Sequence, residues 1–143
     1  MKETIGEIVS HAYEDMEKIK DTTSTKLWEY FSDQMKETII SRKFGESNIT
    51  KKREFVENIC LDLKLHGFNE WETREILNVY EENKLGININ LTKSLCYKVI
   101  AFSITKKTSN LAKIMEELHG FNIDISSKDG IEIYKYCKKF KEI

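Results

Sequence analysis

Apolar residues recur every three or four positions along most of this chain of 143 residues, which is the pattern of amphipathic helices. In the first such segment Ile8, Ala12 and Ile19 fall on one stripe, while acidic residues and lysines fill the opposite face. The chain has no proline and only six glycines, which also favours long helices. We predict seven helices, over residues 3–20, 24–43, 51–66, 70–84, 91–104, 108–119 and 126–142.

Two polar stretches interrupt the pattern in the first third of the chain. The side chains of Asp21–Thr25 (DTTST) compete for backbone hydrogen bonds, so we expect them to end the first helix and cap the second. Phe44–Thr50 (FGESNIT) is the loop after the second helix and the best candidate for a boundary. We therefore expect residues 1–45 to form an N-terminal helical pair, as a core extension or a dimer interface, and residues 51–143 to form a five-helix unit.

The predicted helix 91–104 is apolar on most sides, with charges only at Lys93 and Lys98. A helix of this kind normally lies at the centre of a bundle. The run Tyr97–Ile104 also fits a buried strand, because a short apolar run does not distinguish the two. The helix is favoured, since no neighbouring segment offers a strand for pairing. The predicted fold class is all-α, a single helical bundle of about seven helices.

The five-residue sequence LHGFN occurs twice, at Leu65–Asn69 and at Leu118–Asn122. Each copy follows an apolar-periodic helix, so we predict Gly67 and Gly120 to follow the last helical turn in the left-handed conformation that glycine adopts without penalty. The sequences after the two copies differ. Two helices with the same type of ending therefore explain the repeat better than a tandem duplication does.

The residues after each glycine fit the same interpretation. The phenylalanine in each copy can fold back onto the helix that it follows. Asn69 can cap the next helix, with Glu72 as the returning partner of a capping box. After the second copy, Ser126 or Ser127 can cap the last helix. The repeat is thus predicted to mark two chain reversals between neighbouring helices.

Composition limits the class of protein. Hydrophobic residues make up 40% of the chain and charged residues 33%, which indicates a soluble globular protein. The net charge of −1 argues against non-specific coating of nucleic acid. The N-terminus carries charges throughout, without a signal-peptide pattern, and no apolar run approaches the ~20 residues of a membrane helix. We expect a cytoplasmic protein that does not enter a membrane.

The sequence offers no catalytic or metal-binding motif. Cys60, Cys96 and Cys137 are far apart and none belongs to a C-x-x-C pair, so they are expected to be buried thiols in a reducing compartment. His66 and His119 fall at predicted helix ends, and no histidine has the spacing of a metal site or of a nucleophile with its base. No glycine-rich phosphate loop is present. We predict neither an enzyme nor a cofactor.

The order of predicted helices from Lys51 onward carries a family resemblance. The buried third helix contains Ser94, Cys96, Ala101 and Ser103, Thr108 precedes Leu111–Ala112, and the last helix runs from a polar cap into a basic aromatic segment. This arrangement resembles one cyclin-box repeat, the five-helix unit of cyclins and of transcription factor IIB, over residues 51–140. The resemblance implies a small intracellular regulator that binds DNA or the transcription machinery.

Basic residues near the C-terminus give this hypothesis its candidate contacts. The predicted helices 108–119 and 126–142 resemble a helix-turn-helix motif, although the turn between them is longer than usual. Ser126, Ser127, Lys128 and Glu132 would then face bases, and lysines would contact phosphates. Alternatively, the lysines are a solvated face that also suits the helix dipole. The candidate nucleic-acid-binding residues are Lys106, Lys107, Ser126, Ser127, Lys128, Lys135, Lys138 and Lys139.

Large aromatic residues support a different hypothesis. Trp28, Phe31 and Trp71 could form an interface with a protein partner or a second copy of the chain, because aromatic residues are enriched at interfaces. Aromatic residues at helical spacing also commonly belong to the core. The alternative function is therefore an interaction-only helical protein, of viral or mobile-element type, that binds a host protein without nucleic acid.

Overall fold

The computed structural model describes residues 5–40, 48–84 and 91–141, and within these ranges it contains α-helices and no strand. The all-α prediction is confirmed, and the alternative of a strand at Tyr97–Ile104 is wrong because these residues are helical. The described ranges form six helices in place of the seven predicted. They are α1 (Ile5–Ile40), α2 (Asn48–Leu65), α3 (Glu70–Lys84), α4 (Lys93–Lys107), α5 (Leu111–Gly120) and α6 (Lys128–Lys141).

The predicted N-terminal pair of helices is wrong, because α1 runs through Asp21–Thr25 without a break. The hydroxyls of Thr22, Thr23, Ser24 and Thr25 each donate to the backbone carbonyl four residues earlier, at 2.8–3.0 Å. In this arrangement the side chains do not compete with the backbone hydrogen bonds of the helix. The predicted boundary loop Phe44–Thr50 lies partly outside the described residues, and α2 already begins at Asn48.

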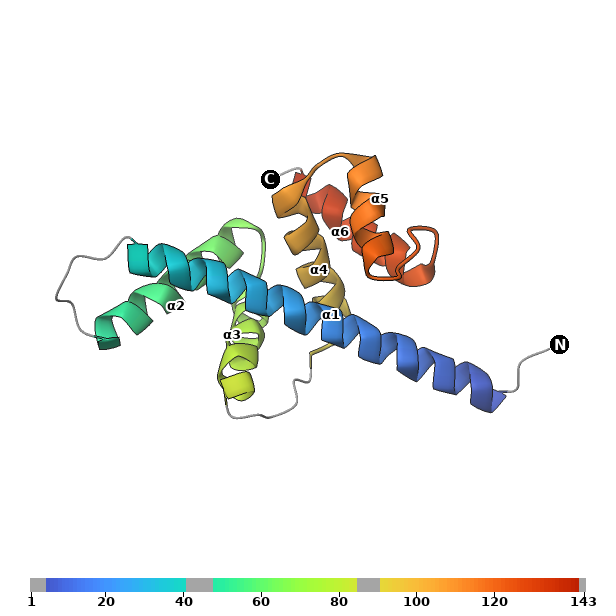
Figure 1. The fold of residues 1–143 in the computed structure, drawn as a ribbon, viewed down its shortest axis with the longest axis horizontal. Helices are drawn as coiled ribbons and strands as arrows, with labels where there is room; N and C mark the ends of the chain where they lie inside the picture. The colour runs from blue at the N-terminus through green and yellow to red at the C-terminus, as the bar shows by residue number, and fades with distance from the viewer. Residues whose placement is uncertain (1–4, 41–47, 85–90, 142–143) are drawn as a thin grey trace.

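A single buried stripe runs along α1 through the predicted break. Its members are Ile19, Thr23, Lys26, Leu27, Tyr30, Phe31, Gln34 and Thr38, all less than a tenth exposed. Thr23 fills the position of this stripe inside DTTST and is fully buried. Through this stripe α1 packs against α2, α3 and α4, and it spans the whole molecule (Figure 1).

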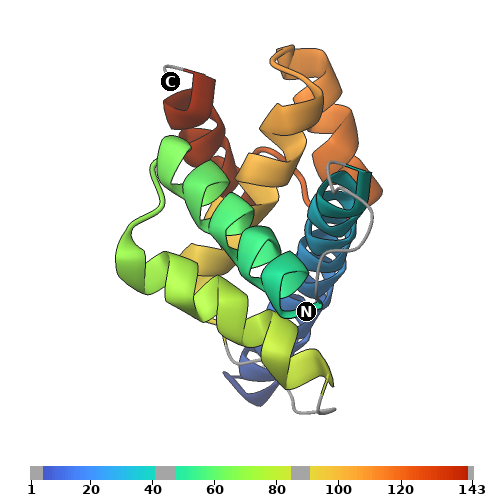
Figure 2. The same ribbon diagram turned by 90° about the vertical axis from the view of Figure 1, so that its left-hand side faces the viewer.

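Helix α4 lies at the centre of the bundle, as its apolar sequence predicts. Eight of its 15 residues are buried, and its main neighbours are α6 and α1. Viewed from the end that carries α2 and α3, these two helices cross in front of α4 and α6 (Figure 2). The buried residues of α4 are Leu95, Cys96, Tyr97, Val99, Ile100, Ala101, Phe102 and Ile104.

The first LHGFN copy forms the predicted corner between α2 and α3. Gly67 has φ 85°, and Gly67 N–H and Phe68 N–H donate to the carbonyls of Lys64 and Leu63 at 3.1 and 3.0 Å, which is a Schellman ending. Phe68 is 4% exposed. The predicted capping box is also present: Asn69 N–H donates to the Glu72 carboxylate (2.9 Å), and Glu72 N–H donates to the Asn69 side chain (2.8 Å).

The second copy uses the same five residues in another register, so the prediction for Gly120 is wrong. Gly120 is the last residue of α5, and the left-handed residue is Asn122, with φ 59°. Asn122 N–H and Ile123 N–H donate to the carbonyls of His119 and Leu118, both at 2.9 Å. This is the same Schellman ending, shifted by two residues along the LHGFN sequence. The buried position after the corner is therefore taken by Ile123, not by the phenylalanine.

The two glycines should consequently respond differently to alanine. Gly67→Ala places a Cβ on a left-handed residue and should lower the free energy of unfolding by about 1–2 kcal/mol. Gly120→Ala should leave it unchanged or raise it slightly, because an added Cβ meets no atom within 4 Å and alanine favours the helix. Urea unfolding followed by circular dichroism measures both changes. Equal losses in the two variants would contradict the different registers.

Candidate interaction surfaces

Lys106, a predicted phosphate contact, belongs to a charged cluster that joins α1, α2 and α4. Its ammonium lies 2.9 Å from the Asp62 carboxylate, which also accepts a hydrogen bond from the Tyr30 hydroxyl (3.0 Å). The same ammonium lies over the rings of Tyr30 (4.6 Å) and Phe102 (4.8 Å). Burial and the Asp62 charge raise the pKa of Tyr30 well above its ordinary value, so its hydroxyl stays a donor. Lys106 thus has a partner within the chain.

The two serines before α6 are also engaged within the chain. Ser127 caps α6: its hydroxyl accepts from Gly130 N–H at 3.1 Å. The Asp124 carboxylate accepts hydrogen bonds from the backbone N–H and the hydroxyl of Ser126, at 2.9 and 2.8 Å. These bonds hold the pKa of Asp124 below its ordinary value. The predicted base contacts Ser126 and Ser127 therefore already have structural roles in the loop.

The carboxylates of Asp124, Asp129 and Glu132 lie at this end of α6, beside Lys93, Lys128 and Lys135. Asp129 lies in the first turn, accepts a hydrogen bond from the Tyr97 hydroxyl and lies 3.8 Å from Lys93. The predicted base contact Glu132 follows one turn later, and Lys128 is exposed beside them. Carboxylates at this end repel phosphates, which works against insertion of the first turn of α6 into a nucleic-acid groove.

The remaining predicted lysines lie toward the C-terminal ends of α4 and α6. Lys107, Lys135, Lys138 and Lys139 are all exposed, and Lys135 pairs with Glu132 at 3.1 Å. The two helix ends lie close together, because the rings of Phe102 and Phe140 are 6.0 Å apart. The structure therefore brings part of the predicted set together at one end of the molecule, away from Ser126 and Lys128.

The three predicted interface aromatics have different surroundings. Phe31 is 1% exposed and packed in the core, where it offers no surface to a partner. Trp28 is 39% exposed and packs edge-on against Phe31 and Tyr80, with ring centroids 6.5 and 5.9 Å apart. Trp71, in the first turn of α3, is 52% exposed.

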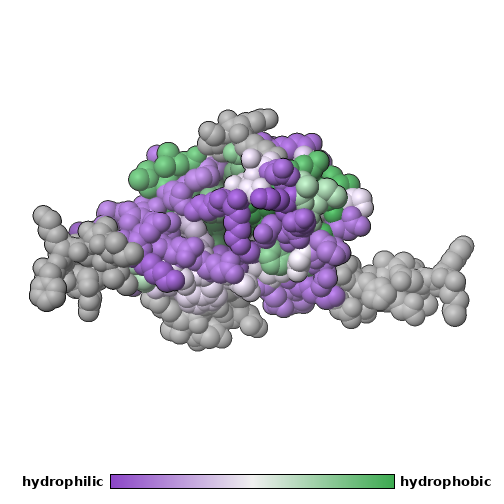
Figure 3. Space-filling model, turned by 45° about the horizontal axis from the view of Figure 1, so that its top comes forward, coloured by the Kyte–Doolittle hydropathy of each residue, from purple (hydrophilic) through white to green (hydrophobic). Residues whose placement is uncertain are grey.

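Two pairs of exposed aliphatic residues were missed by the sequence interpretation. Leu61 and Leu65 lie one turn apart on α2 and are 59% and 63% exposed. Leu111 and Met115 lie one turn apart on α5 and are 47% and 43% exposed. In the view of Figure 3, hydrophobic residues gather toward the left and the right of the molecule, with mostly hydrophilic residues between them. The buried face of α2 carries Phe55, Ile59 and Leu63 at helical spacing. Leu61 and Leu65 lie off this face, which is the signal that could have identified them.

A groove runs between α1 and α2 beside the exposed leucines. Its walls combine carboxylates, amides and aliphatic side chains, and the described residues that line it include no cation. The lining residues are Gln34, Glu37, Glu54, Asn58, Leu61, Asp62 and Leu65. This groove is the most complete candidate binding surface, since it offers hydrophobic contact, hydrogen bonding and charge in one place.

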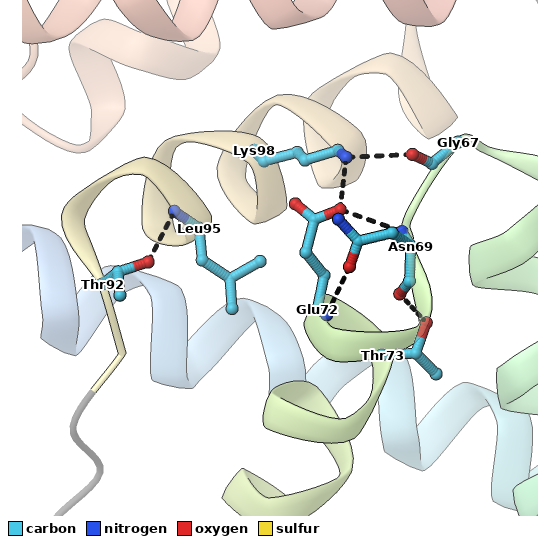
Figure 4. Close-up of polar contacts among 7 residues, drawn as sticks. All are labelled: Gly67, Asn69, Glu72, Thr73, Thr92, Leu95 and Lys98. Carbon is cyan, nitrogen blue, oxygen red and sulfur yellow. Dashed lines mark hydrogen bonds and ion pairs between the residues drawn. The ribbon is translucent and has the colours of Figure 1, made fainter.

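A second charged cluster fixes the corner between α2 and α3 (Figure 4). The Lys98 ammonium, on α4, donates to the Glu72 carboxylate (2.8 Å) and to the Gly67 carbonyl (3.0 Å), and it lies 4.6 Å from the centre of the Phe68 ring. Both side chains of the Lys98–Glu72 pair are only 14% exposed. The first LHGFN copy is thus attached to the central helix, and this cluster has a structural rather than a binding role.

Other classes of site find no support in the described part of the chain. No three or more His, Cys, Asp or Glu side chains there are arranged to hold a metal ion. Cys96 and Cys137 are buried and Cys60 is half-buried, and none of the three forms a disulfide. No helix there has both the length and the apolar character needed to cross a membrane. Comparison with protein-family models, curated proteins and solved structures gives no match for this chain.

Proposed function

We propose that this chain is a helical binding module that acts by contacting another protein. The observation that carries the proposal is the exposure of two aliphatic pairs, Leu61 with Leu65 and Leu111 with Met115, on the surfaces of α2 and α5. Single exposed apolar residues are common, but paired ones that form a patch are typical of interaction sites. Exposed Trp71 and half-covered Trp28 could add the aromatic anchors that such interfaces favour.

The charges support a protein partner over a nucleic acid. Lys106 and Lys135 have carboxylate partners within the chain, and Asp124, Asp129 and Glu132 surround the N-terminal end of α6. A protein that binds DNA gains most of its affinity from phosphate contacts with free cations. The engaged lysines and the nearby carboxylates reduce the number of such contacts.

Binding to DNA or to the transcription machinery is the second candidate. It is favoured by the exposure of Lys107, Lys138 and Lys139 where the C-terminal ends of α4 and α6 meet. The order of helices from α2 to α6, with the most buried helix third, fits the cyclin-box resemblance on which this candidate rests. In this case the lysines would contact phosphates and would contribute affinity without sequence preference.

Affinity capture from an extract of the native host, with and without nuclease, distinguishes the two candidates. For protein binding, we expect the captured protein to survive nuclease and moderate salt, and to be lost when either aliphatic pair is replaced by serine. We also expect no binding of duplex DNA at low salt. Capture that nuclease abolishes, together with DNA binding whose salt dependence weakens in a Lys107, Lys138 and Lys139 alanine variant, would overturn the proposal.

A further inference from the structure

The groove between α1 and α2 is lined by a buried polar side chain, that of Gln34. Gln34 is 8% exposed, and no hydrogen bond to its side-chain amide is found among the residues that the structure describes. The residue lines this groove and also the adjoining groove between α1 and α4. Leaving a buried amide unpaired is unfavourable, so a bound group that pairs with it gains affinity.

The amides of the groove suit the backbone of an extended peptide. A glutamine side chain both donates and accepts, as does each peptide unit of an extended segment, whereas the backbone groups of a helix are already paired. Asn58 lines the same groove, and its side chain donates to Thr38 at 3.4 Å. Leu61 and Leu65 flank these amides and offer an apolar surface for a side chain of the same segment.

The charges that line the groove favour a positively charged partner segment. Glu37, Glu54 and Asp62 line it, and the described lining residues include no lysine or arginine. Of these, Glu37 is exposed on α1, whereas Glu29 and Asp33 line the adjoining groove between α1 and α4 together with Lys26, Lys106 and Lys107. Asp62 is already paired with Lys106, so Glu37 supplies the attraction.

We propose that the groove between α1 and α2 binds an extended segment of a partner protein, with an apolar residue beside a lysine or arginine. The Gln34 amide pairs with the segment's backbone, the two leucines cover its apolar side chain, and Glu37 attracts its cation. This inference rests on the proposed function and identifies the partner's chemistry.

A library of random peptides displayed on phage, selected on the full chain, tests the inference. We expect enrichment of sequences in which an apolar residue neighbours lysine or arginine. A labelled synthetic peptide of the enriched sequence should bind about tenfold more weakly to Gln34→Leu. This variant should unfold at no lower urea concentration than the parent, because it removes a buried unpaired amide. A counterpart peptide with glutamate in place of its basic residue should not bind.

Ile131, which is 45% exposed on α6 and belongs to neither aliphatic pair, provides the matched control. Ile131→Ser should bind the same peptide as the parent does, whereas Leu61→Ser and Leu65→Ser should bind it more weakly. No enriched peptide, an acidic consensus, or equal affinity in the Gln34→Leu variant would overturn the inference. Peptides lost only in Leu111→Ser would also overturn it, but they would leave the proposed function of protein binding in place.

Discussion

Gly130→Ala should lower the free energy of unfolding by about 3 kcal/mol or more, the largest effect that we expect from any single methyl group in this chain. Gly130 is buried in the first turn of α6. A Cβ at this position would overlap the Asp124 carbonyl oxygen and would lie 2.7 Å from the Ile125 Cα. Both are backbone atoms. The hydroxyl of Ser127 donates to the same carbonyl, so the loop cannot shift without losing that bond.

The control for this substitution is Gly120→Ala, which adds the same methyl group where no atom lies within 4 Å. Urea unfolding of the two variants measures the difference directly. A loss below about 0.5 kcal/mol for Gly130→Ala, within the range of ordinary surface substitutions, would contradict the close contact between α6 and the loop before it.

Lys98→Ala should lower the free energy of unfolding by about 2–3 kcal/mol, because it leaves the Glu72 carboxylate largely buried without its cation. The substitution also removes the hydrogen bond to the Gly67 carbonyl and the contact with the Phe68 ring. These contacts attach the α2–α3 corner to α4, so α3 should lose protection from hydrogen exchange before the other helices.

Two variants separate the buried pair from ordinary surface charge. Arg74→Ala removes an ion pair of 3.8 Å in which both side chains are exposed, and it should change stability by less than about 0.5 kcal/mol. Glu72→Gln retains an acceptor for Asn69 N–H, so any loss beyond that of Arg74→Ala reports the charge interaction with Lys98. Equal small effects for Lys98→Ala and Arg74→Ala would show that the corner is held by packing alone.

The helices from α2 to α6 could be predicted from the sequence because their apolar periodicity is uninterrupted. Their observed ends lie within a few residues of the predicted ones. The capping box at Asn69 and Glu72 was also predictable, since both of its side chains act on backbone groups within one turn. Local sequence carries this information whenever the interaction itself is local.

The continuity of α1 could not be predicted, because it depends on packing between distant segments. Thr23 is fully buried on the stripe that faces the rest of the bundle, and its hydroxyl is paired with the Ile19 carbonyl. A run of threonine and serine is compatible with either a cap or a helix whose hydroxyls bond backward. Whether this run caps a helix or continues it is determined by the tertiary contacts of α1, which cannot be read from the local sequence pattern.

The two LHGFN copies show a similar limit. In the first copy Phe68 fits the core and fixes Gly67 as the left-handed residue. In the second copy Ile123 is buried, which extends the helix by two residues and moves the left-handed position to Asn122. The position of the left-handed residue therefore depends on which residue is buried in the core after the corner. The LHGFN sequence alone does not determine it.

The candidate binding surfaces were only partly accessible to sequence reasoning. The sequence identified Trp28 and Trp71, but not the aliphatic pairs or the groove between α1 and α2. That groove exists because α1 is one helix whose residues near Gln34 lie beside Asn58 and Leu61 of α2. An interpretation that ended a helix at Asp21–Thr25 left the position of this part of α1 undefined.

Hydrogen exchange at residues 21–25 tests most directly that α1 is one helix joining α2, α3 and α4 in a single core. The amides of these residues should exchange as slowly as those of 95–104 in α4, with opening free energies close to that of global unfolding, about 5–15 kcal/mol for a domain. Fast exchange confined to residues 21–25, between two protected segments, would mean two helices and a loop, and would contradict the account.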